Sequence, residues 1–192
     1  MKKSSIIALL FILCGGGIIG YSGWEIYKTK AETSKSLVEA KELIQQGREN
    51  NSQEVIKKSD VKFGETIGIL SIPVLNAELP IVEGTDPDDL DKGVGHYRGS
   101  YLPDENGQIV LSGHRDTVFR DMGKLKLGDT LVIQLPTGDF TYKITNTKIV
   151  SADDTSIITL QDEEEELILT TCYPFSYIGD APDRYIMYAE RQ

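Results

Sequence analysis

The stretch Leu167-Ile168-Leu169-Thr170-Thr171-Cys172-Tyr173-Pro174 joins an apolar run to a thiol. Short runs of aliphatic and β-branched side chains are typical of buried strands, so we predict a strand over Leu167–Thr171. Pro174 has no backbone N–H and cannot continue a central strand. Cys172 is therefore expected at the end of the strand, where the strand fixes its position and the following loop leaves it accessible.

Two further reactive side chains occupy similar positions. His114 follows an apolar strand predicted at Gln108–Ser112, and Arg184 opens the last strand, predicted at Tyr185–Ala189. A thiolate attacks carbonyl groups, an imidazole transfers protons, and a guanidinium donates to a developing oxyanion. Together the three side chains suffice for acyl transfer. The sequence does not show that they meet in space, because His114 lies far from Cys172 along the chain.

Outward from these segments, short β-rich runs alternate with turn residues from about residue 63 onward. Two short helical turns are expected near Asp86–Asp91 and Val118–Leu125. Many short strands separated by Gly, Pro, Asn and Asp predict one antiparallel-rich sandwich or barrel. The predicted strands are Ile67–Pro73, Ala77–Val82, Gln108–Ser112, Thr130–Leu135, Phe140–Val150, Leu167–Thr171 and Tyr185–Ala189.

The N-terminal region has the pattern of a membrane anchor. Residues Ile6 to Trp24 carry no charge and are mostly Ile, Leu, Phe and Gly. At about 1.5 Å per residue this stretch is roughly 28 Å long as a helix, close to the hydrocarbon thickness of a bilayer. Lys2 and Lys3 precede it and favour a cytoplasmic N-terminus, with the rest of the chain outside. The alternative is a cleaved signal peptide, but no Ala-x-Ala-like site follows the run.

Between the apolar run and the strands the chain is polar. Leu37, Ala40 and Ile44 recur at helical spacing, and Gly47 is expected to end such a helix. We interpret this part as a partly helical stalk, which either packs on the following domain or forms only a weak helix. The expected organisation is a cytoplasmic N-terminus at 1–5, a transmembrane anchor at 6–24, a stalk at 25–62 and a catalytic domain at 63–192.

Net charge argues against one class of function, and the cysteine content draws attention to Cys172. The chain has 192 residues and a net charge of −10, which argues against a generic nucleic-acid binder. Its two cysteines, Cys14 and Cys172, do not easily pair if the first lies in the membrane. A lipid attachment site at Cys14 is disfavoured because bulky Leu13 precedes it. Cys172 is then a lone thiol in a compartment where thiols are usually paired, and it is either reactive or a small buried core residue.

Other side chains compete for the same roles. His96 lies between glycines and Tyr97, which suggests a turn and a structural or substrate-facing role. Arg115 would point away from the face of His114 in an extended strand. Arg120 and Arg191 are further alternatives to Arg184.

The sequence gives little support for a metal site, and we expect no cofactor. Two isolated histidines and one thiol lack the spacing of a zinc site. Calcium is the remaining alternative, although the acids do not follow the EF-hand pattern. Those acids are Glu83, Asp86, Asp88, Asp89 and Asp91.

Four motifs together resemble the sortase family of Gram-positive bacteria, most closely its class D. The resemblance covers Ile67 to Arg191, and the class D likeness rests on the segment 169–175. It implies an eight-stranded β-barrel with short helices and with the catalytic groups at one end of the strands. The motifs are Gly93-Val94-Gly95-His96-Tyr97, Ser112-Gly113-His114-Arg115-Asp116-Thr117, Leu169-Thr170-Thr171-Cys172 and Ala181-Pro182-Asp183-Arg184-Tyr185.

The resemblance also implies a function. In the family pattern His114 is the general acid and base, Cys172 is the nucleophile, and Arg184 stabilises the oxyanion or positions the substrate. The implied substrates are secreted proteins with a C-terminal signal resembling Leu-Pro-x-Thr-Gly or, in class D, Leu-Pro-x-Thr-Ala. Such a thiol peptidase and acyltransferase cleaves after Thr, and an amine of a cell-wall precursor resolves the thioacyl enzyme.

Two alternatives remain open at this point. A pilin-polymerising sortase would use the same chemistry with a lysine as the acceptor. A non-catalytic wall-binding β domain would need none of it, although retention of all three reactive side chains counts against that reading. No large segment precedes the predicted barrel, so we expect no lid of the kind found in pilin sortases.

Overall fold

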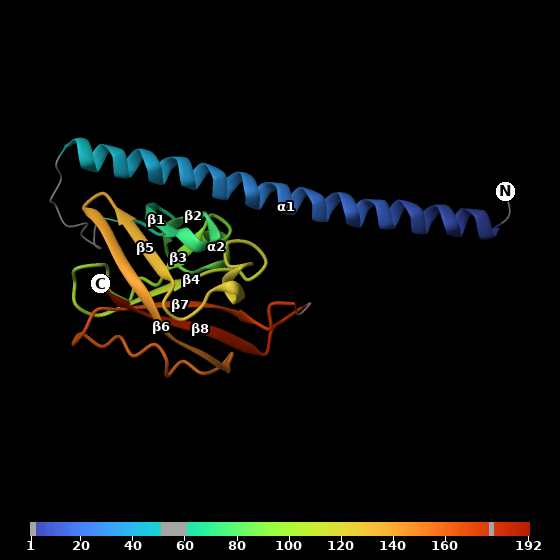
Figure 1. The fold of residues 1–192 in the computed structure, drawn as a ribbon. Helices are drawn as coiled ribbons and strands as arrows, with labels where there is room; N and C mark the ends of the chain where they lie inside the picture. The colour runs from blue at the N-terminus through green and yellow to red at the C-terminus, as the bar shows by residue number, and fades with distance from the viewer. Residues whose placement is uncertain (1–2, 51–60, 177–178) are drawn as a thin grey trace.

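Eight strands close into a barrel in the order β1-β2-β3-β4-β7-β8-β6-β5 (Figure 1). The structure is a computed structural model and describes residues 3–50, 61–176 and 179–192. The pairs β2–β3 and β4–β7 are parallel and the other pairs are antiparallel. The strands are β1 (Thr66–Ile72), β2 (Ala77–Glu83), β3 (Val94–His96), β4 (Gln108–Ser112), β5 (Thr130–Leu135), β6 (Gly138–Ser151), β7 (Glu166–Tyr173) and β8 (Asp183–Arg191). The eight-stranded barrel implied by the resemblance is confirmed.

The one strand that the sequence analysis missed is β3. We predicted a turn at His96, and that prediction is wrong, because His96 ends this strand. A Cβ atom on Gly95 would lie 2.3 Å from the carbonyl oxygen of Gly84, so the glycine serves close packing of neighbouring backbones and not a turn. The predicted helical turns correspond to α2 (Pro87–Leu90) and the 3₁₀ turn η2 (Met122–Lys124), while a second 3₁₀ turn, η1 (Pro73–Leu75), joins β1 to β2.

Side chains of β7 alternate between the barrel interior and a layer outside the barrel wall. Leu167 and Leu169 belong to the main core, whereas Ile168 belongs to a smaller outer cluster. Successive side chains of a strand point to opposite faces, so Thr170 and Cys172 share the outer face with Ile168. The buried members of the outer cluster are Val150, Ile157, Ile168 and Ile186.

A single helix, α1 (Lys3–Glu49), runs through the expected anchor and through residues 25–49 of the expected stalk. Its first half is apolar and the helix is long enough to cross a membrane. We predicted that Gly47 ends the helix, and that prediction is wrong, because α1 continues to Glu49. The missing side chain of Gly47 allows close contact instead, since a Cβ atom there would lie 2.6 Å from Cβ of Pro136. Residues 51–60 of the expected stalk and residues 1–2 of the expected cytoplasmic N-terminus lie outside the described residues.

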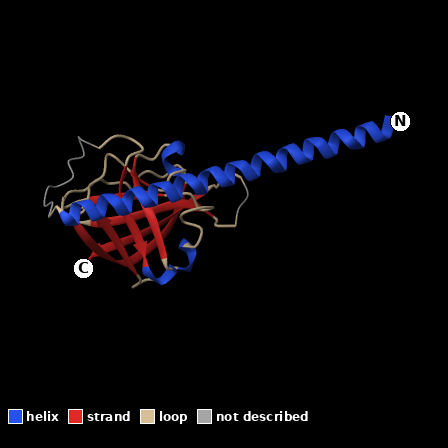
Figure 2. Cartoon of the chain, turned by 90° about the horizontal axis from the view of Figure 1, so that it is seen from above, coloured by secondary structure: helices blue, strands red, loops and turns tan. Residues whose placement is uncertain are grey.

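The C-terminal half of α1 packs along the barrel wall, as Figure 2 shows. Ala40 and Ile44 form a buried cluster with Ile69 of β1. An ion pair of 2.6 Å between Lys41 and Glu78 of β2 flanks this cluster. The alternative of a helix that packs on the domain is therefore the one observed.

We predict that this packing adds measurable stability. A chain beginning at Glu25 keeps the docked helix, whereas a chain beginning at Val61 loses it and exposes Ile69. Burial of one such side chain contributes about 1.5–3 kcal/mol, so the shorter chain should fold with a lower melting temperature. Thermal melts of the two chains check this. Equal melting temperatures would show that α1 contributes nothing to the core, and failure of the shorter chain to fold would show that the barrel depends on it.

Candidate active site

Cys172 and Arg184 face each other across two neighbouring strands. They are register partners in the antiparallel pair β7–β8, and both are half-buried. Directly opposed residues project from the same face, with Cβ atoms about 4.5–5.5 Å apart. The structure thus brings together two of the three side chains singled out in the sequence, and it places them on the outer face of the barrel wall.

His114 is held beside this pair by the strand on the other side of β7. Gly113 follows β4 directly, and its N–H donates to the carbonyl oxygen of Thr170 over 3.1 Å. The hydroxyl of buried Thr171 donates to the carbonyl oxygen of Gly113 over 2.7 Å. The residue before His114 is thus bonded to both residues that precede Cys172. His114 is half-buried, and the β4–β7 register, continued by two residues, puts its backbone level with that of Cys172.

The connection between β6 and β7 is held by hydrogen bonds beside the outer face on which the thiol lies. Gln108, the buried first residue of β4, donates from Nε2 to the carbonyl oxygen of Ile157 over 3.2 Å. Its Oε1 accepts from the N–H groups of Thr159 and Leu160 at 2.9 and 3.2 Å. Ile157 in turn belongs to the apolar cluster under this segment. The connection between β6 and β7 is therefore fixed beside the outer face of β4 and β7.

Arg184 is oriented by its own loop. Its Nη1 donates to the carbonyl oxygens of Ala181 and Asp183 over 3.2 and 3.0 Å. These acceptors lie at and just before the start of β8. A guanidinium has five N–H donors, so donors remain for another acceptor beside Cys172.

Arg115 is a residue whose role the sequence analysis did not recognise. Its side chain is only 7% exposed, and its guanidinium reaches the loop that follows Cys172. There Nη1 donates to the carbonyl oxygen of Pro174 over 3.2 Å and Nη2 donates to that of Gly179 over 2.8 Å. Arg115 therefore ties the segment of His114 to the loop between β7 and β8. Its position directly after the histidine was the available signal, but its burial depends on packing that the sequence does not display.

His96 is buried and engaged away from the thiol. Its side chain is fully enclosed, with Nδ1 2.7 Å from Oε2 of Glu83, which is itself buried. Its Nε2 donates to the carbonyl oxygen of Tyr101 over 3.0 Å, since a carbonyl can only accept. The hydroxyl of Ser100 lies 3.1 Å from the same nitrogen. These contacts make His96 a structural residue of β3, which is one of the two readings that the sequence left open.

Arg191 has other partners, as do Glu83 and Asp89 among the acids considered for calcium. Arg191 lies at the far end of β8, with its guanidinium 4.6 Å from the ring centre of Phe140 and 3.3 Å from Glu165. Nearby Tyr142 donates to Glu165, and burial together with this bond raises the pKa of the tyrosine. Asp89 lies 3.8 Å from Nζ of Lys92. Within residues 3–50, 61–176 and 179–192, no three acidic, histidine or cysteine side chains gather into a metal site.

The arrangement provides the parts that acyl transfer needs. The thiol is a nucleophile once deprotonated. The imidazole can pass a proton to a leaving amine and take one from an incoming amine. The guanidinium can donate to the oxygen on which negative charge develops.

Comparison with known proteins gives one consistent result. Residues 70–192 match the Sortase domain family. The chain is 57% identical to Sortase D of Bacillus subtilis (strain 168) over 198 aligned positions, which cover 100% of this chain and 99% of that protein.

Solved structures agree with this match. A Clostridium perfringens Sortase D5 transpeptidase is similar with a TM-score of 0.71 and 27% identity, covering 84% of this chain and 99% of that one. Clostridium perfringens sortase C, solved with the C-terminal cell wall sorting motif, has a TM-score of 0.64 and 27% identity, covering 92% of this chain and 98% of that one. The chain therefore belongs to the sortase family of cysteine transpeptidases.

Proposed function

We propose that the protein is a membrane-anchored sortase that cleaves a C-terminal Leu-Pro-x-Thr-Gly or Leu-Pro-x-Thr-Ala type signal after Thr and joins the freed end to an amine of a cell-wall precursor. The observation that carries this proposal is the register that sets Cys172 opposite Arg184, together with the two hydrogen bonds that join Gly113, the residue before His114, to Thr170 and Thr171. Because the family consists of cysteine transpeptidases, the alternative of a non-catalytic wall-binding domain is wrong.

In the first half-reaction the thiolate of Cys172 attacks the carbonyl carbon of the threonine. Arg184 donates hydrogen bonds to the oxyanion of the tetrahedral intermediate. The C–N bond then breaks, and His114 protonates the departing amine, which would be a poor leaving group without that proton. The product is a thioester between Cys172 and the threonine.

In the second half-reaction an amine attacks the thioester carbonyl. His114 accepts the proton that the amine loses, and Arg184 again donates to the oxyanion. Collapse of this intermediate forms the amide and releases the Cys172 thiolate. The protonation states of thiol and imidazole then match those at the start, so no further reactant is needed.

Two observations support the proposed substrate class and location. The similar sortase C structure is described with a cell wall sorting motif, which supports a signal of that class as the acyl donor. The apolar first half of α1 supports an anchor, and Lys2 and Lys3 before it support a cytoplasmic N-terminus with an extracellular barrel. A lysine acceptor, as in pilin polymerisation, would use the same three residues, and only the incoming amine distinguishes the two.

We predict that Cys172→Ala folds as the wild type does but neither cleaves nor transfers a sorting peptide. The substitution removes one sulfur atom from a half-buried position, so little stability is lost. Peptide cleavage and amide formation are followed by mass spectrometry, with Cys14→Ala as the matched control that keeps full turnover. Residual turnover near the wild-type rate in Cys172→Ala would contradict the nucleophile assignment.

We predict opposite defects for the two histidines. His114→Ala should lose about 10²–10⁴-fold in kcat/KM while keeping its melting temperature, because a general acid and base contributes that much. His96→Ala should lose mainly stability, since it leaves buried Glu83 without its partner and such losses cost about 3–5 kcal/mol. Turnover is measured per folded molecule. Equal losses of kcat/KM in the two variants would undermine the choice of His114.

We predict a similar contrast between two arginines. Arg184→Lys keeps the charge but not the planar fork, so kcat/KM should fall by about 10²–10³-fold with an unchanged melting temperature. Arg191→Lys should keep turnover but melt earlier, because it loses the stacking on Phe140, worth about 1 kcal/mol. If Arg184→Lys retains more than about a third of the wild-type efficiency, charge alone is sufficient.

We predict that Arg115 acts as a positioning residue. In Arg115→Lys one ammonium replaces two donors that hold Pro174 and Gly179, so the loop after Cys172 shifts. A displacement of about 1 Å can cost about 10²-fold in rate, and Arg115→Met, which has no donor, should lose more than Arg115→Lys. The rate at which iodoacetamide alkylates Cys172 should stay near the wild-type value in Arg115→Lys. A kcat/KM loss no larger than the loss of folded protein would show a merely structural role.

A further inference from the structure

We propose that α1 is a rigid support that turns the catalytic end of the barrel toward the bilayer and holds it a short distance above the lipid headgroups. This inference rests on the proposed function only in assuming that the apolar half of α1 lies in the membrane. The catalytic end is defined here as the end of the barrel where β4 and β7 finish and β8 begins. The opposite end is defined by the turn at residues 136–137, between β5 and β6.

Strand registers identify which loops belong to each end. Ser151, the last residue of β6, pairs with Asp183 at the start of β8, so the turn that begins β6 lies at the opposite end. Gly95 of β3 pairs with Ser112 at the end of β4, so the chain that enters β3 lies at the catalytic end. The connection between β1 and β2 also lies there, because β2 runs parallel to β3.

The helix α1 touches both ends in a defined order. Near its C-terminus, Arg48 lies 2.7 Å from Asp139, next to the turn at the opposite end. Fourteen residues before Gly47, the hydroxyl of Thr33 donates to the carbonyl oxygen of Asp91, which precedes β3 at the catalytic end. Followed from its C-terminus back to its N-terminus, α1 therefore runs from the opposite end to the catalytic end and then continues as its apolar half. Figure 1 shows the same direction, since the N-terminus of α1 extends beyond the loop between β7 and β8.

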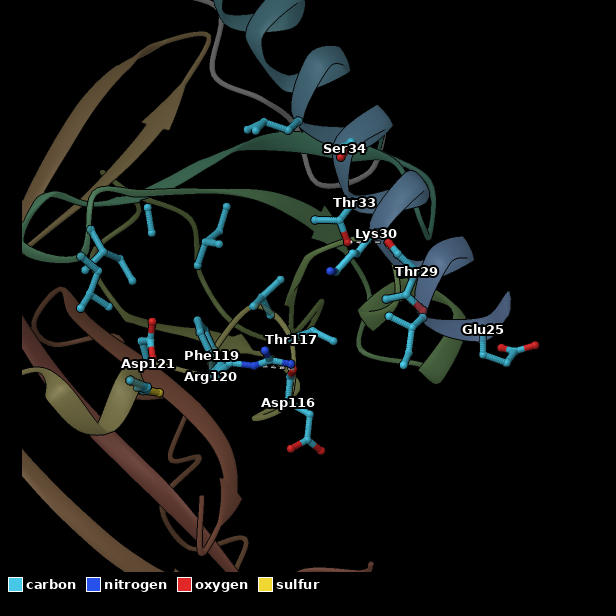
Figure 3. Close-up of a pocket in the computed structure, with 18 residues that line it drawn as sticks. Glu25, Thr29, Lys30, Thr33, Ser34, Asp116, Thr117, Phe119, Arg120 and Asp121 are labelled. Carbon is cyan, nitrogen blue, oxygen red and sulfur yellow. Dashed lines mark hydrogen bonds between the residues drawn. The ribbon is translucent and has the colours of Figure 1, made fainter. Parts of the chain in front are cut away.

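A hollow of about 930 Å³ separates α1 from the barrel at the catalytic end. Figure 3 shows Thr29, Lys30 and Thr33 of α1 on one side of this hollow and Thr117 and Arg120 on the other. The second group belongs to the segment that follows His114 in the sequence. α1 therefore passes the catalytic end on the wall formed by β1 and β2, while Cys172 lies on the outer face of β7, elsewhere around the barrel.

Helix geometry gives the height of the site above the membrane. Trp24 ends the uncharged run, and Thr33 marks the level of the catalytic end. Nine residues of helix rise about 14 Å, of which the headgroup layer takes up roughly half. An ion pair between Lys28 and Glu32 lies in this interval and adds a little support to the exposed turn. The opposite end, at the level of Gly47, would lie about 21 Å farther out.

This orientation selects how substrates reach the thiol. A polypeptide still held in the bilayer, or an amine carried on a lipid, lies at about the same height above the membrane as the catalytic end. The surface that the catalytic end faces is therefore that of the membrane. Acyl donors and acceptors presented there gain a high effective concentration that soluble ones lack.

The orientation itself is tested without any catalysis. In a Cys14→Ala, Cys172→Ala background, one dye is attached at Lys124→Cys, at the catalytic end, and in a second protein at Glu163→Cys, at the opposite end; both residues are exposed. The full chain is placed in liposomes that carry an acceptor dye on lipid headgroups. A height difference of about 21 Å predicts about two-fold or greater energy transfer from Lys124→Cys. Equal transfer, or greater transfer from Glu163→Cys, would overturn the proposal.

The consequence for substrates is tested by raising the barrel. Seven helix-forming residues inserted after Lys30 add about 10 Å and turn the helix by only about 20° from its original face. The same seven residues inserted after Asn50 leave the interval between the apolar run and Thr33 unchanged and serve as the matched control. In liposomes, turnover of a lipid-tethered sorting peptide should fall about five-fold or more in the first variant only.

A soluble sorting peptide separates the outcomes of this second test. All three proteins should turn it over at equal rates, because the insertion does not touch the site. An unchanged rate with the tethered peptide in the Lys30 insertion would show that height does not matter and would overturn the inference. No turnover of either peptide by the wild type would instead count against the proposed function, while the energy-transfer result would stand on its own.

Discussion

The pairing of β7 with β4 on one side and with β8 on the other sets the position of each residue proposed to react. The parallel ladder with β4 ends at Ser112 opposite Thr170, and two further hydrogen bonds join Gly113 to Thr170 and Thr171. The antiparallel ladder with β8 places Arg184 opposite Cys172. A slip of one residue in either ladder would move these side chains to the other face of the wall. The chemistry therefore depends on register, which the buried apolar side chains of the three strands enforce.

Buried polar side chains support this frame at the points where loops would otherwise be free. Gln108 fixes the segment before β7, Arg115 fixes the loop after it, and His96 with Glu83 fixes β3 against its neighbours. Each is buried and hydrogen-bonded, as a polar group must be to avoid the cost of burial. Such groups are expensive to mutate even though none of them is proposed to touch the substrate. The long helix α1 extends the same rigidity from the barrel toward the membrane.

The sequence was most informative where one local pattern determined the outcome. Apolar runs ending at Cys172 and His114 predicted β7 and β4, and the motifs they share with the sortase family predicted the closed barrel. β3 was missed because a three-residue strand containing glycine has no apolar run. The continuity of α1 through Gly47 was missed because that glycine is in contact with Pro136, far along the chain. Arg115 was unrecognised for the same reason, since its acceptors lie 59 and 64 residues away.

The central claim is that Cys172 carries the acyl group between two amines, and the mass of the intact enzyme tests it most directly. The purified protein is mixed with a sorting peptide and quenched in acid before and after addition of an amine acceptor. The account predicts an adduct with the mass of the peptide up to its threonine, located on Cys172 by fragmentation. Addition of the amine should discharge it and yield an equal amount of amide product. An adduct on another residue, or amide formed without any adduct on Cys172 in rapid-quench samples, would contradict the account.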